Sequence, residues 1–114
     1  MSAFDEFWRG AVRFRHVSRE LKPLVHDVHA NVRDVGALER LLAFLAGDGR
    51  TDANCDVVHH FLASIEPEWS SLDEPLRRIY DDMSGTLHET IYRPDIARTF
   101  ESLPEQLLAR VRSL

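Results

Sequence analysis

The most regular helical pattern in this chain is LDEPLRRIYDDMSGTLHETI, residues 72–91. Its apolar residues recur every three or four positions and form one stripe: Leu72, Leu76, Ile79, Met83, Leu87 and Ile91. Pro75 suits a first helical turn, where its missing N–H has no helical partner to lose. Pro94 ends the pattern, because the residue before a proline is pushed out of the α region. We therefore predict a central helix near residues 72–91.

Helical spacing recurs in the rest of the chain. The other expected helices are residues 3–21, 24–33, 35–46 and about 51–65, a short piece at 95–100, and a last helix after Ser102. Ser2, Asp34 and Thr51 or Asp52 are placed to cap helix starts. No run of β-branched or aromatic residues alternates between turn signals, so no strand is expected. The fold prediction is a single-domain, all-α bundle of five or six short helices.

Size and composition bound the class of protein. The chain has 114 residues and is 44% hydrophobic and 29% charged, which is typical of one soluble domain. No apolar run approaches the roughly 20 residues that span a bilayer. The N-terminal residues do not resemble a signal peptide. Cys55 is the only cysteine, so no intramolecular disulfide forms, and we expect a cytoplasmic protein.

Charge is distributed unevenly along the chain. The net charge is −5, but residues 34–74 alone contain two basic and nine acidic side chains, a net charge of −7. This argues against direct binding of nucleic acid, which usually requires a basic surface. It favours a basic protein partner, although the acids could simply keep the protein soluble. The candidate partner-binding residues are Asp48, Asp52, Glu66, Glu68, Trp69, Asp73 and Glu74.

Trp69 has two interpretations. It lies in a segment, residues 66–71, that appears in no helical stripe and that we interpret as a linker. An exposed tryptophan surrounded by charge is typical of an interface anchor. Alternatively, Trp69 folds back and plugs the end of the bundle.

The histidines raise the alternative of a metal site. The chain has six, and the candidate ligands are His26, His29, Asp56, His59 and His88. His26 and His29 share a helix face, as metal-binding pairs do. However, the Glu-x-x-His motif of di-iron bundles and the known zinc motifs are absent, so no metal or other cofactor is expected. Cys55 with His59 one turn later could act as a nucleophile and base, or Cys55 could be a small core residue.

Three hypotheses for function remain. The first is a non-catalytic interaction protein whose acidic region binds a basic partner, as small acidic immunity or antitoxin proteins bind a basic toxin or nuclease. The second is a small helical metalloprotein or metal-dependent enzyme that uses the histidines. The third is a subunit that associates mainly with itself through leftover apolar surface.

Overall fold

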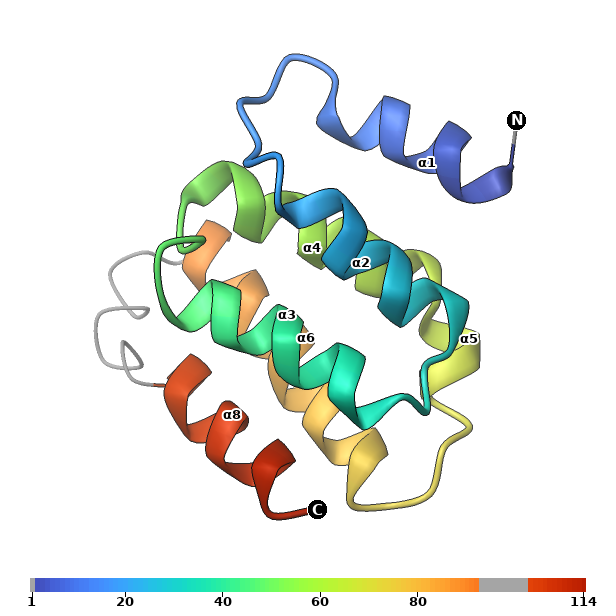
Figure 1. Cartoon of the computed structure of the whole chain (residues 1–114), viewed down its shortest axis with the longest axis vertical. Helices are drawn as coiled ribbons and strands as arrows, with labels where there is room; N and C mark the ends of the chain where they lie inside the picture. The colour runs from blue at the N-terminus through green and yellow to red at the C-terminus, as the bar shows by residue number, and fades with distance from the viewer. Residues whose placement is uncertain (1, 93–102) are drawn as a thin grey trace.

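The computed structural model describes residues 2–92 and 103–114. Within these residues the chain forms seven α-helices and no strand, which confirms the all-α prediction (Figure 1). The helices are α1 (Ala3–Val12), α2 (Leu21–Ala30), α3 (Val35–Ala46), α4 (Asp52–Ser64), α5 (Glu66–Trp69), α6 (Leu76–Tyr92) and α8 (Leu103–Arg112). The helical piece expected at 95–100 and the cap expected at Ser102 lie outside the described residues.

Local capping chemistry sets three of the helix starts. At the start of α1, the side chain of Ser2 accepts a hydrogen bond from the backbone N–H three residues later. The side chains of Asp34 and Thr51 accept the corresponding bonds at the starts of α3 and α4. Each bond satisfies one of the backbone N–H groups that a helix start leaves without a helical partner. These starts agree with the sequence prediction.

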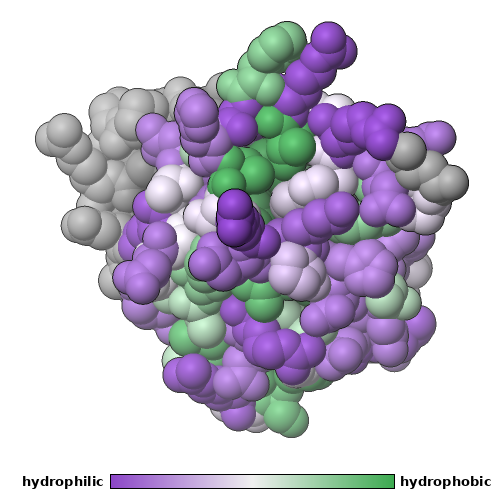
Figure 2. All heavy atoms as spheres, turned by 45° about the horizontal axis from the view of Figure 1, so that its top comes forward, coloured by the Kyte–Doolittle hydropathy of each residue, from purple (hydrophilic) through white to green (hydrophobic). Residues whose placement is uncertain are grey.

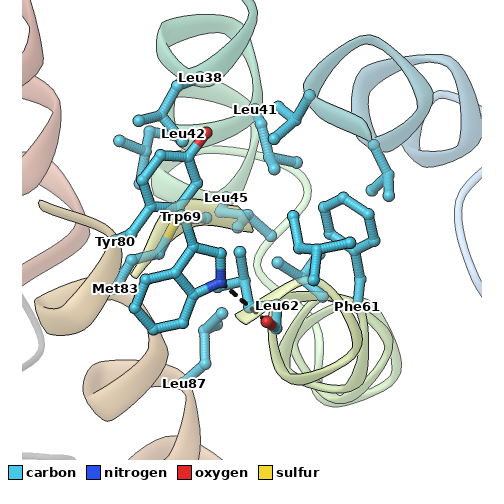
Figure 3. Close-up of a cluster of buried hydrophobic side chains, with 14 of the residues drawn as sticks. Leu38, Leu41, Leu42, Leu45, Phe61, Leu62, Trp69, Tyr80, Met83 and Leu87 are labelled. Atoms are coloured by element: carbon cyan, nitrogen blue, oxygen red, sulfur yellow. Dashed lines mark hydrogen bonds between the residues drawn. The ribbon is translucent and has the colours of Figure 1, made fainter. Parts of the chain in front are cut away.

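The core lies between α3, α4 and α6. Figure 3 shows leucines of α3 facing α4 and α6, with Phe61 and Leu62 on α4 and Met83 and Leu87 on α6. Helix α8 covers α3 and α6 on one side, and α2 packs on α3. Helix α1 lies at the periphery, against α2 and α4. None of the helices in the described residues is long and apolar enough to cross a membrane.

The first helix is shorter than predicted. The sequence pattern extended it to Leu21, with Phe14 on the apolar stripe, but α1 ends at Val12 and Phe14 is 94% exposed. Phe14 has a φ of 67°, in the left-handed region that helices do not use. The reason is a tertiary contact. Arg15 donates to the Ala11 carbonyl and forms an ion pair with Asp56 on α4, so the chain leaves the helix to reach α4.

Three other helices also differ from the prediction. The second helix, expected at 24–33, spans Leu21–Ala30 and so begins and ends three residues earlier. The central helix begins at Leu76 rather than Leu72, although Leu72 is buried as expected. Residues 66–69, expected as a linker, form the single helical turn α5, with Pro67 in its first turn. This extra turn lies directly after α4 and brings the following segment back over the core.

A buried asparagine joins two loops. Asn54, on α4, is fully buried. Its Oδ1 accepts from the Ser18 N–H at 3.0 Å, and its Nδ2 donates to the Ser18 Oγ and to the Gly49 carbonyl, both at 2.9 Å. All the polar atoms of its amide group are therefore bonded, as burial requires. Asn54 ties the α1–α2 loop to the α3–α4 loop.

Candidate functional site: an acidic end of the bundle

Trp69 is buried and fixes α5 on the core. Only 4% of its surface is exposed, its indole Nε1 donates to the Leu62 carbonyl at 2.8 Å, and its ring stacks on that of Tyr80 (Figure 3). The interpretation of Trp69 as an exposed interface anchor is therefore wrong, and the plug interpretation agrees with the structure. The sequence could not decide this, because Tyr80 is eleven residues away on another helix.

The burial of Trp69 leaves the neighbouring acids pointing outward. Ile65, Trp69 and Leu72 take the inward positions around α5 and are buried. Glu66 and Glu68 on α5, and Asp73 just after it, are exposed and form no ion pair within residues 2–92 and 103–114. We call Glu66, Glu68 and Asp73 the acidic end.

Glu74 differs from the acidic end in its charge balance. Its carboxylate lies 2.8 Å from Arg77 Nη2 and 3.4 Å from Arg78 Nη2. The two arginines outweigh its single negative charge. Glu74 therefore contributes little to an acidic surface, although the sequence analysis placed it there.

The remaining two acidic candidates lie elsewhere on the molecule. Asp48 precedes α4 and Asp52 begins it, whereas Glu66 follows its end. The thirteen residues of α4 separate the two groups by about 18 Å at the rise of an α-helix. Asp52 also has a local role, because a negative charge in a first turn stabilises the helix dipole. The acidic segment of the sequence is thus two separate surfaces.

A shallow hollow adjoins the acidic end. It has a volume of about 440 Å³ and lies between the end of α2 and the region of α5. Pro67, Glu68 and Ser71 line one side. His29 and Arg33 line the other, together with Ala30, Asn31 and Val32. The hollow is therefore polar and of mixed charge, with one carboxylate of the acidic end on its wall.

The histidine candidates are engaged in separate contacts. His26 and His29 both pack against the Phe4 ring. Their ring centroids lie 5.0 Å and 5.1 Å, respectively, from the Phe4 centroid. His59 lies beside His88, at 5.5 Å between ring centroids. Asp56 pairs with Arg15 at 2.6 Å and with His60 at 3.3 Å. Within the part of the chain that the structure describes, no three His, Cys, Asp or Glu side chains are grouped so that they could hold a metal ion.

Cys55 is a core residue. It is buried, and burial raises the pKa of its thiol to about 11. Arg50 opposes this shift in pKa and Asp52 adds to it. The thiol is therefore protonated at neutral pH, whereas a nucleophilic cysteine needs a lowered pKa. The structure favours the core interpretation of Cys55 over the nucleophile interpretation.

Sequence reasoning missed a second exposed feature, the loop at Phe14. Phe14 was expected in the core because it continued the apolar spacing of α1. Its position between Arg13 and Arg15 indicates exposure, because charged residues on both sides of an aromatic residue interrupt an apolar stripe.

Fold and site together define an all-α helical bundle with an acidic surface at one end. Comparison of the chain with models of known protein families, with curated proteins and with solved structures gives no match. The assignment of function therefore depends on the chain's own residues.

Proposed function

We propose that this chain is a non-catalytic protein-interaction module that binds a basic protein partner at its acidic end. The observation that carries the proposal is the exposure of Glu66 and Glu68, on a turn that Trp69 fixes to the core, and of Asp73 just after that turn. Because no ion pair within the described residues neutralises them, their charges are available to a partner.

The rigid attachment of α5 matters for binding. Trp69 and its neighbours hold the backbone of the acidic end before any partner arrives, so association orders only the long side chains. The net charge of −5 attracts a basic protein from a distance and speeds encounter at low salt. A basic toxin or nuclease, of the kind that an immunity or antitoxin protein binds, is one partner with the positive charge that this surface requires.

Charge reversal tests the proposal. Tagged protein captures partners from an extract of the source cells, and the affinity of the purified basic partner is then measured by calorimetry. The variant Glu66→Lys/Glu68→Lys/Asp73→Lys should weaken binding at least about tenfold. The reason is that each exposed charge contributes roughly 0.5–1 kcal/mol to binding through its ion pair with the partner.

The matched control makes the same change in charge elsewhere. Glu6, Glu20 and Asp81 are exposed and form no ion pair within the described residues, so Glu6→Lys/Glu20→Lys/Asp81→Lys tests net charge alone. Its affinity should fall much less. Equal losses in both variants, with both folded by circular dichroism, would mean that the acidic end is not the binding surface.

A further inference from the structure

The α1–α2 loop presents an aromatic side chain to solvent. Phe14 is 94% exposed, and its φ of 67° is strained for a residue with a bulky side chain. The Arg13 guanidinium lies over the ring, 5.0 Å from its centroid. Figure 2 turns α1 and this loop towards the viewer, and hydrophobic side chains gather there among hydrophilic ones. An exposed aromatic residue in a strained conformation points to a role outside the fold.

The loop is anchored directly after Phe14, through Arg15 and Ser18. Arg15 directs Nε and Nη2 at the Asp56 carboxylate, each 2.6 Å away, and its Nη1 donates to the Ala11 carbonyl at 2.8 Å. Ser18 bonds to the buried Asn54 through its N–H and its hydroxyl. The backbone beside Phe14 is thus held before binding, which lowers the entropy lost when a partner covers the ring.

The residues that flank Phe14 in the sequence are mainly basic. Arg9, Arg13 and Arg19 are exposed and form no ion pair with another described residue. Glu20 is the one acid within residues 13–20. We call residues 13–20 the Phe14 loop. Its charge is opposite to that of the acidic end.

The Phe14 loop and the acidic end lie at opposite ends of the same two helices. Helix α2 begins directly after the loop, and α4 begins beside it, where Asn54 bonds to Ser18. The far end of α2 and the region of α5 after α4 line the same hollow. Figure 1 shows the loop before α2 and the turn α5 on opposite sides of the molecule. The two surfaces of one copy therefore cannot meet, but those of two copies can.

We propose that the Phe14 loop docks on the acidic end of a second copy of this chain. Phe14 enters the hollow of about 440 Å³ beside α5, and Arg13 and Arg19 face Glu66, Glu68 and Asp73. His29 and Arg33 also line the hollow; the planar guanidinium of Arg33 can stack on an aromatic ring there, as Arg13 does in the free loop. This contact is head-to-tail, so it leaves one loop and one acidic end open for further copies.

A second copy explains more of these features than the other occupants. A membrane surface needs no fixed backbone. The net charge of −5 opposes anionic lipid and nucleic acid, and also a second copy, but the second copy brings a fixed acidic end whose charge is opposite to that of the loop. The inference rests on the acidic end that we propose as the site for a basic partner, and it implies that self-association and that partner compete.

Sedimentation velocity of the untagged protein tests the proposal in low and high salt. We expect masses above the monomer that grow with concentration and fall in 0.5 M NaCl, where charge pairs are screened. Phe14→Ser should weaken association about tenfold or more, as loss of an interface anchor does. The matched control is Leu114→Ser, which removes the second large exposed hydrophobic residue among those that the structure describes and should leave association unchanged.

Complementary variants give the sharpest test. Arg13→Glu/Arg19→Glu reverses the loop, and Glu66→Arg/Glu68→Arg reverses the acidic end. Each variant alone should remain monomeric, whereas an equimolar mixture should associate, because each supplies the charge that the other lacks. The control Glu6→Arg/Asp81→Arg should associate like the wild type.

Other outcomes overturn the inference. A wild-type protein that stays monomeric at all concentrations, or a mixture that does not associate, excludes docking between copies. Binding of monomers to phosphatidylglycerol vesicles that is lost in Phe14→Ser would assign the loop to a membrane instead. The proposed function fails separately, through its own affinity measurement with the basic partner, so the two failures can be told apart.

Discussion

The rings of Trp69 and Tyr80 stack almost in parallel, with their centroids 5.8 Å apart and 10° between their planes. The Tyr80 hydroxyl continues the contact by donating to the Val32 carbonyl at 2.8 Å. One aromatic pair therefore connects α5, α6 and the segment after α2. The acidic end and the hollow beside it owe their positions to this connection.

Removal of the tryptophan should destabilise the whole protein. Trp69→Ala opens a cavity next to Tyr80 and should lower the free energy of unfolding by about 3–5 kcal/mol, a large part of what a domain of this size has. Urea unfolding followed by circular dichroism measures the change. Trp69→Phe keeps a ring on Tyr80 and should lose less. Equal stability of wild type and Trp69→Ala would contradict the structural role given to Trp69.

Removal of the Tyr80 hydroxyl tests the hydrogen bond between α6 and the segment after α2. Tyr80→Phe keeps the stacked ring but leaves the Val32 carbonyl without its donor, and should cost about 1–3 kcal/mol. Thermal and urea unfolding both report this loss. A Tyr80→Phe protein as stable as the wild type would show that water replaces the hydroxyl.

The sequence predicts those parts of the fold that neighbouring residues determine. The caps at Ser2 and Asp34 act over three residues, so their pattern is visible locally. The end of α1 is not visible, because it depends on Arg15 reaching Asp56, 41 residues further on. Long-range contacts of this kind override helical spacing.

The same division applies to the candidate site. An acidic segment was evident from composition, and the balancing of Glu74 by Arg77 and Arg78 follows helical spacing of three and four. The separation of Asp52 from the acidic end was not evident, because it depends on the direction and length of α4. Composition predicts charge but does not say which charges share a surface.

Loss of the buried amide should loosen the Phe14 loop. Asn54→Ala leaves the Ser18 N–H and the Gly49 carbonyl without their partner, and should lower the free energy of unfolding by about 2–3 kcal/mol. Trypsin should then cleave faster after Arg19. Asn31→Ala is the control, because Asn31 is exposed and its side-chain Oδ1 accepts a local bond from the Arg33 N–H. Equal cleavage rates in the two variants would contradict the role of Asn54.

The thiol of Cys55 should react slowly in the folded protein. Its pKa of about 11, against an ordinary 9.0, lowers the thiolate fraction at pH 8 about 100-fold, and burial restricts access further. Reaction with 5,5′-dithiobis(2-nitrobenzoate) should be slow in buffer and fast in urea. Cys55→Ser supplies the blank. A fast reaction of the native protein would restore the nucleophile hypothesis.

His59 should make the protein less stable in mild acid. Burial lowers its pKa below the ordinary 6.5, the charges of His88 on α6 and His60 on α4 lower it further, and Asp56 partly opposes them. Above pH 6.5 His59 is neutral in both folded and unfolded chains, so its contribution to stability is complete. As the pH falls below 6.5, the unfolded chain takes up the proton first and stability is lost until the folded pKa is passed.

A substitution isolates this effect from the other titrating groups. The difference in unfolding free energy between wild type and His59→Gln should shrink as the pH falls from 7.5 to about 5, because only the wild type loses the His59 contribution. Urea unfolding at each pH supplies the values. Parallel curves for wild type and His59→Gln would mean that His59 titrates alike in the folded and unfolded chains.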